Sequence, residues 1–226
     1  MASKSPRSHQ GVGKTTLSSE LINQKWQSFT KLFKREKLFR RVPAGYGGTY
    51  LFGGGSSISR IGTDHCQTCV GVYFVIDGQR YFAAHIQCWV EASDTTAAGL
   101  RIPNAATYQR LQQEITQRLD VEAAQSGWLQ PSEAMRNSLV MVCKAQVTDS
   151  QGRQSWDTVV GNCIADAVAG WLGVPEGDAR RRPSERGGFI VKHPGQKRKM
   201  FDHLIDTSRW TAVPDHPQDR QRDFGV

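Results

Sequence analysis

Two apolar runs joined by a tight turn constrain the fold more than any other feature of the sequence. Residues 69–76, CVGVYFVI, and residues 80–86, RYFAAHI, flank the dipeptide Asp77-Gly78. Asp-Gly between two stretches rich in β-branched and aromatic residues is the strongest short signal for a β-hairpin. Both runs are almost continuously apolar, which indicates strands that are covered on both faces. The sequence therefore predicts a hairpin inside a layered domain.

Helix and strand signals alternate in the rest of the chain. Asn104 is a typical N-cap for a helix that we expect to end near Gln125, and a second helix is predicted over 157–172, before Gly173 and Pro175. Short strands are predicted at 49–52, 57–61, 139–147 and 189–192. We expect an α/β (α+β) fold of mixed β-sheets flanked by helices over residues 49–210, followed by a flexible tail at 211–226.

The formal net charge of +8 lies entirely in residues 1–48, which hold ten Lys or Arg residues and two Glu. Within this segment Ile22, Trp26, Phe29 and Phe33 recur at helical spacing, so we expect an amphipathic helix over about 16–41. The prediction is a basic N-terminal arm over residues 1–48. Such an arm is either a solvated helix packed on the domain or a contact for an anionic partner.

Membrane and secretory signals are missing from the sequence as given. No apolar run approaches the ~18 residues of a transmembrane helix, and residues 1–16 contain no apolar core of a signal peptide. The five cysteines are an odd number, which favours reduced thiols. We expect a cytoplasmic or nuclear protein.

Two motifs suggest ligands. Gly13-Lys14-Thr15 resembles the end of a phosphate-binding loop, but residues 1–10 cannot form the buried strand that must precede such a loop. Cys66, Cys69, His85 and Cys88 have the pairwise spacing of zinc ligands. A zinc-stabilised binding module is therefore an alternative function, although a full apolar hairpin separates the two pairs.

Cys69 and His85 lie at the outer ends of the predicted hairpin, where they form a candidate nucleophile and base. A two-residue turn would place them on opposite faces. A three-residue loop, 77–79, would place them on one face and diagonally across the strands, within reach of each other. Thr63 is a candidate to orient the imidazole, the third role in a catalytic triad.

The segment Thr63-Asp64-His65-Cys66-Gln67-Thr68-Cys69 resembles the active-site segment of the CheD family of chemotaxis-receptor glutamine deamidases. That family has a threonine six residues before the cysteine, a small hydroxyl residue directly before it, and a histidine about sixteen residues later. The toxin deamidases related to cytotoxic necrotizing factor share the arrangement, and the run 68–73 is also similar to fungal proteins. The order of later elements is similar too, so the resemblance covers roughly residues 49–206.

The resemblance implies a cysteine-dependent amidohydrolase that converts exposed glutamine side chains of a protein substrate to glutamate. Cys69 would be the nucleophile, His85 the base, Thr63 its orienting group, and Thr68 with nearby backbone amides the oxyanion site. The chemistry needs no cofactor or metal. The sequence departs from the family pattern at Gln67, at the additional Cys66 and in a basic loop at 180–186. These differences bear on the identity of the substrate rather than on the chemistry. A catalytically inactive interaction protein with the same fold is the remaining alternative.

Overall fold

The structure is a computed structural model of the 226-residue chain, and it describes only part of that chain. The described residues are 37–51, 60–87, 95–97, 100–128, 130–144, 147–148, 154–155, 160–192, 197–201, 210–212 and 220–225. All of them belong to one unit, Arg35–Val226. The phosphate-loop motif at Lys14 and the apolar stripe from Ile22 to Phe33 lie outside the described residues.

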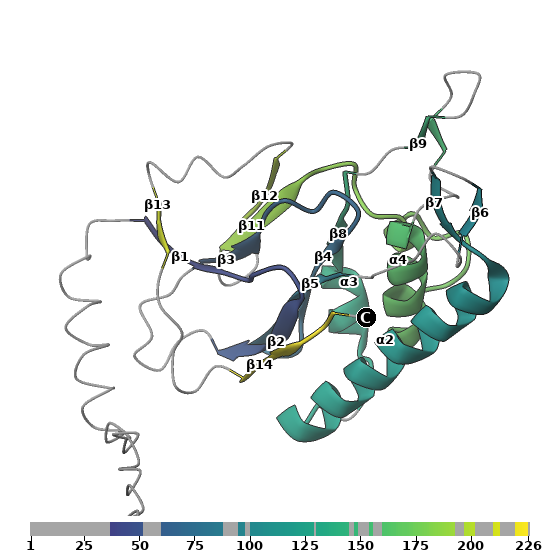
Figure 1. The fold of residues 1–226 in the computed structure, drawn as a ribbon. Helices are drawn as coiled ribbons and strands as arrows, with labels where there is room; N and C mark the ends of the chain where they lie inside the picture. The colour runs from purple at the N-terminus through teal and green to yellow at the C-terminus, as the bar shows by residue number, and fades with distance from the viewer. Residues whose placement is uncertain are drawn as a thin grey trace, which may run out of the picture. The chain divides into compact units, whose positions relative to one another are not determined.

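A first five-stranded sheet has the strand order β12-β11-β3-β1-β13 (Figure 1). β1 pairs in parallel with β3 and with β13, whereas β11 is antiparallel to both of its neighbours. The sheet is therefore mixed, as predicted. Its strands are β1 (Lys37–Arg41), β3 (Arg60–Thr63), β11 (Gly188–Lys192), β12 (Lys197–Phe201) and β13 (Trp210–Ala212).

A second five-stranded sheet has the order β14-β2-β5-β4-β8, and all its pairs are antiparallel. Its strands are β2 (Tyr46–Leu51), β4 (Val70–Val75), β5 (Arg80–Ile86), β8 (Val140–Val142) and β14 (Arg220–Asp223). Two small antiparallel pairs lie outside the large sheets: β6 (Thr95–Ala97) with β7 (Leu100–Pro103), and β9 (Val147–Thr148) with β10 (Gln154–Ser155).

The predicted hairpin is formed by β4 and β5, and its turn has three residues. Val75 is paired with Tyr81, and the Ile76 amide donates to the Arg80 carbonyl at 2.9 Å, which leaves 77–79 as the loop. The Asp77 carboxylate accepts from the Gln79 and Arg80 amides, at 2.9 and 2.8 Å, so the side chain closes the turn. Of the two predicted registers, the structure has the one that places Cys69 and His85 diagonally.

Three α-helices and one 3₁₀-helix are found among the described residues: α2 (Ala105–Ser126), α3 (Glu133–Ser138), α4 (Val160–Trp171) and η2 (Ala179–Arg181). Asn104 caps α2 as predicted, because its side chain accepts from the Thr107 amide at 2.9 Å. Gly127, with φ 69°, ends the helix in the left-handed conformation that glycine adopts without a steric penalty. The short α3 was not predicted.

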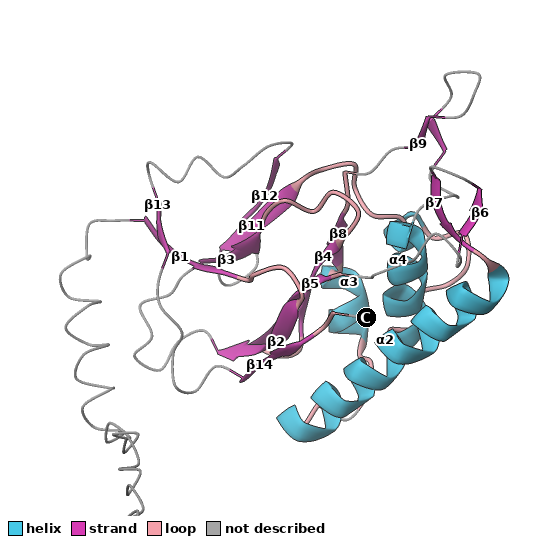
Figure 2. Ribbon diagram, viewed as in Figure 1, coloured by secondary structure: helices cyan, strands magenta, loops and turns pink. Residues whose placement is uncertain are grey.

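The second sheet lies between the helices and the first sheet (Figure 2). On one face its apolar side chains pack with α2 and α4 in a single core that includes Val72, Phe74, Phe82, Leu111, Ile115, Leu119, Ile164 and Val168. On the other face the Tyr73 ring packs against Phe189 of the first sheet, with their centroids 6.2 Å apart. Both faces of the hairpin are therefore buried, as its apolar composition predicted.

The predicted boundary of the N-terminal arm is wrong. Lys37–Arg41 form strand β1 rather than the end of a helix, and Tyr46–Leu51 form β2, so residues 37–48 belong to the domain. Arg40 is buried, with its guanidinium carbon 5.9 Å from the centre of the Tyr50 ring. The helical spacing of residues 22–33 did not indicate where the helix would end and β1 begin. The partners of β1, namely β3 and β13, lie far away in the sequence.

The predicted flexible tail is also wrong for its last residues. β14 pairs with β2, and the Phe224 amide and carbonyl bond to Gly45 and Gln87. The Phe224 side chain is 1% exposed and packs edge-on against Phe82, with their centroids 5.5 Å apart. The chain end therefore contributes to the core.

We expect Phe224→Ala to lower the free energy of unfolding by about 3 kcal/mol, because it removes a buried ring and leaves a cavity. Urea unfolding followed by circular dichroism measures the change. Tyr46→Ala is the control, since that ring is 46% exposed, and it should have little effect. Equal, small effects of both variants would show that the chain end is not part of the core.

Candidate active site between the two sheets

Thr63 and His85 meet where the two large sheets face each other. Thr63 ends β3 of the first sheet, and His85 lies near the end of β5 of the second. The Thr63 Oγ1 is 2.8 Å from the His85 Nδ1 and also 2.8 Å from the carbonyl oxygen of Val42. Both side chains are buried. The predicted contact between Thr63 and the imidazole is therefore present.

These contacts define which ring nitrogen of His85 carries the proton. The Val42 carbonyl can only accept, so the single hydroxyl proton of Thr63 is donated to it. The Thr63 oxygen must then accept from His85, which places the ring proton on Nδ1. The Nε2 atom is left with a lone pair and has no hydrogen-bond partner among the described residues. A lone pair on Nε2 is what a general base requires.

Burial also keeps His85 neutral. Removal from water lowers the pKa of His85 from 6.5 to about 4, because the charged imidazolium is poorly solvated there. The Asp64 carboxylate raises this pKa, while Arg41 and His65 lower it. At neutral pH the imidazole is therefore available as a base rather than already protonated.

Gly71 allows the close approach of the two sheets at this point. It is the residue of β4 that pairs with His85. A Cβ atom at Gly71 would lie 2.8 Å from Thr63 Cγ2 and 3.0 Å from Cys66 Sγ, both closer than van der Waals contact permits. The missing side chain makes room for Thr63 opposite the imidazole.

Cys69 directly precedes β4 at the same end of the hairpin. Continuing the register from Gly71 opposite His85 and Val70 opposite Ile86 would place Cys69 diagonally across from His85. Among the four described cysteines, Cys69 alone is partly exposed, whereas Cys66, Cys143 and Cys163 are buried. Thr68 is partly buried in the same loop. The accessible thiol of this region is thus the one that the sequence singled out.

The loop that carries Cys69, residues 64–69, is held by two other segments. The Cys66 amide donates to the Gly187 carbonyl at 2.9 Å, and the Cys66 carbonyl accepts from the Lys144 amide at 2.7 Å. The Cys143 thiol donates to the Gln67 carbonyl at 3.2 Å. The backbone beside Cys69 is therefore fixed from both sides, and fixed backbone groups favour a preorganised site.

Backbone strain and an ion pair lie in the same loop. His65 has φ 60°, a left-handed conformation that is uncommon for residues other than glycine and costs about 1–3 kcal/mol. Its neighbour Asp64 is buried and bonded to the Arg41 guanidinium, with Nε 2.8 Å and Nη2 2.7 Å from Oδ1. The ion pair joins the loop to the end of β1 and helps to hold this conformation.

Three of the four candidate zinc ligands lie in the described part of the chain. Within the part of the chain that the structure describes, no three His, Cys, Asp or Glu side chains are arranged to hold a metal ion. Cys66, Cys69 and His85 are all described, while Cys88 lies outside the described residues. Burial raises the pKa of the Cys66 thiol, as do the nearby Cys143, Cys69 and Asp64, so without a metal ion this thiol stays protonated at neutral pH.

Several residues of the site escaped prediction. The Val42 carbonyl is a backbone group, so no residue type in the sequence indicates that it accepts from Thr63. The Cys143 contact joins segments 76 residues apart, so no local pattern could reveal it. Gly71 did carry a signal, because an isolated glycine inside a strand indicates a close approach of another group.

No family model matches the chain, and no curated protein matches it either.

In the described part of the chain, no helix has both the length and the apolar character needed to cross a bilayer.

The buried neutral His85 predicts how stability depends on pH. The unfolded chain binds a proton at this residue below about pH 6.5, whereas the folded protein resists it down to about pH 4. Above pH 6.5 His85 is neutral in both states and does not affect the free energy of unfolding. As the pH falls from 6.5 to 4, protonation of the unfolded chain lowers the free energy of unfolding by about 3 kcal/mol in total. Urea unfolding at several pH values between 4 and 7 measures it.

His85→Gln provides the comparison for that experiment, because glutamine does not titrate. We expect this variant to lose the His85 part of the pH dependence, while His65→Asn, at an exposed position, keeps it. The same slope in His85→Gln as in the wild type would contradict a buried, neutral His85.

We expect Gly71→Ala to separate Thr63 from His85, because the added methyl group occupies the space of the Thr63 side chain. Overpacking of this kind typically costs about 1–3 kcal/mol. Histidine ¹⁵N spectra would show loss of the single Nδ1–H tautomer. Gly78→Ala is the control, since a Cβ there meets no atom within 4 Å. An unchanged tautomer in Gly71→Ala would contradict the proposed role of the glycine.

Proposed function

We propose that the protein is a cysteine-dependent amidohydrolase that deamidates glutamine side chains of a protein substrate. The proposal rests on the Thr63–His85 contact, which leaves a buried lone pair on Nε2 at the end of the hairpin where Cys69 lies. A neutral, oriented base at the same end of the hairpin as an accessible thiol favours activation of that cysteine as a nucleophile.

The first half of the proposed reaction forms a thioester. His85 Nε2 removes the proton of the Cys69 thiol, and the sulfur attacks the carboxamide carbon of the substrate. The C–N bond then breaks, and the imidazolium gives its proton to the departing ammonia. Thr68 and the backbone amides nearest Cys69 would hold the oxyanion of the tetrahedral intermediate.

The second half releases glutamate. Water, deprotonated by His85, attacks the thioester, and the sulfur leaves as the thiol after it recovers the proton. The net reaction converts one glutamine and one water to one glutamate and one ammonia. Thr63 acts as a positioning residue throughout, because it keeps the ring proton on Nδ1.

The choice of glutamine as the substrate group rests on the resemblance of residues 63–69 to glutamine deamidases. The choice of a cysteine hydrolase rests more broadly on the residues themselves. A protein that has kept this fold but has no activity would lack the reactivity of Cys69, which makes thiol reactivity the first property to test.

We expect iodoacetamide to alkylate Cys69 of the full chain faster than any other described cysteine, with a rate that depends on the Thr63 hydroxyl. Thr63→Val removes the hydroxyl and keeps the shape, so the rate at neutral pH should fall about tenfold. Thr63→Ser keeps the hydroxyl and should retain most of the rate. Mass spectrometry of tryptic peptides gives the rate for each cysteine.

The exposure of Cys69 alone would make it react faster than buried thiols, so the comparison of Thr63→Val with Thr63→Ser is decisive. Equal rates in the two variants would argue against an activated thiol. With glutamine-containing peptides as substrates, ammonia release should vanish in Cys69→Ala and persist in Cys163→Ala, whose buried thiol bonds to the Tyr108 carbonyl.

A further inference from the structure

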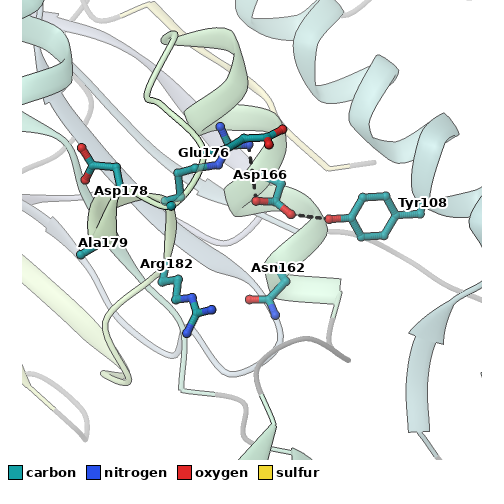
Figure 3. Close-up of a pocket in the computed structure, with 9 residues that line it drawn as sticks. Tyr108, Asn162, Asp166, Glu176, Asp178, Ala179 and Arg182 are labelled. Atoms are coloured by element: carbon teal, nitrogen blue, oxygen red, sulfur yellow. Dashed lines mark hydrogen bonds and ion pairs between the residues drawn. The ribbon is translucent and has the colours of Figure 1, made fainter.

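A pocket of about 680 Å³ lies beside α4, and none of the residues proposed for catalysis lines it (Figure 3). Its walls come from the start of α2, the first half of α4 and the segment 176–182. This volume is in the range of known ligand sites. Such sites are mostly apolar, however, whereas charged and polar side chains line this one.

One wall of the pocket is held in place by an internal network. The Asp166 carboxylate accepts a hydrogen bond from the Tyr108 hydroxyl at 2.5 Å and lies 3.6 Å from Arg181 Nη2. Burial and the Asp166 carboxylate raise the pKa of Tyr108, so the phenol remains a donor. These three side chains satisfy one another and form a fixed wall.

Three other side chains in the pocket have no such partners. Glu176, Arg182 and Asn162 make no side-chain hydrogen bond or ion pair with the described residues. In Figure 3, Arg182 and Asn162 lie at one end of the pocket and Glu176 at the other. The pocket therefore offers a cation with an amide at one end and an anion at the opposite end.

The pocket is connected with the supports of the Cys69 loop. Asn162 follows Gly161, where a Cβ atom would lie 3.7 Å from Val70 Cγ2, and Val70 follows Cys69. On the other wall, Arg182 is two residues from Ser184, whose carbonyl accepts from the Cys143 amide at 3.0 Å. Two walls of the pocket are thus close in sequence to Gly161, which lies near Val70, and to Ser184, which bonds Cys143.

We propose that this pocket binds the segment of the substrate protein next to the target glutamine, with Arg182 pairing an acidic side chain and Glu176 a basic one. Unpaired charges of opposite sign at opposite ends match a peptide that carries both charges, and they would repel part of a nucleic acid or a uniformly charged surface. The role as a substrate site rests on the proposed function, whereas peptide binding does not.

Peptide binding to the full chain carrying Cys69→Ala tests the proposal without turnover. The probes are fluorescent glutamine peptides with one Glu and one Lys at varied distances from the glutamine, measured by anisotropy. We expect Arg182→Glu to weaken the best binder about fivefold, as the exchange of an exposed ion pair for repulsion predicts. Replacing the peptide's Glu with Lys should restore binding to Arg182→Glu. Glu176→Lys should also weaken this binder, and replacing the peptide's Lys with Glu should restore its binding.

Lys192→Glu is the matched control, because it reverses one exposed charge at the end of β11 and should leave binding unchanged. No binding by any peptide, or equal effects of Arg182→Glu and Lys192→Glu, would overturn the pocket assignment. Deamidation by the wild type that persists in that case would leave the proposed function intact. Charge-dependent binding with no deamidation would support the pocket as a peptide site and contradict the proposed function.

Discussion

The close approach of the two sheets at Gly71 is the constraint on which the rest of the site depends. Gly71 pairs with His85 across the hairpin. Because Gly71 has no side chain, the Thr63 side chain of the first sheet fits against it. The approach buries the imidazole and puts its Nδ1 within hydrogen-bond distance of the threonine hydroxyl. The Thr63–His85 contact therefore joins the two sheets and determines which ring nitrogen of His85 carries the proton.

The cysteines around this contact divide into structural and accessible ones. Cys66 and Cys143 are buried, and hydrogen bonds of their backbone or thiol groups hold the loop 64–69. Burial raises the pKa of Cys66 and so keeps its thiol inert. Cys69, in the same loop, is partly exposed. The loop is therefore anchored by buried cysteines and carries one partly exposed cysteine.

Local signals predicted the elements whose stabilising contacts are close in sequence. The β4–β5 hairpin and the Asn104-capped α2 follow from turn chemistry, capping and side-chain periodicity, and the structure confirms both. β1 and β14 were missed because their partners are remote, with Lys37 pairing Trp210 and Arg220 pairing Thr49. A short strand completed by such a partner carries no periodic signal of its own.

The sequence by itself identified the candidate reactive groups, namely a threonine, a cysteine and a histidine near one end of a hairpin. It also limited their geometry to two registers, separated by one loop residue. Only the tertiary structure decided between these registers, brought Thr63 to His85, and supplied the Val42 carbonyl that fixes the ring proton. The reason is physical: a hydrogen bond between strands of different sheets depends on packing distance and pleat direction, and these are set by contacts throughout the domain.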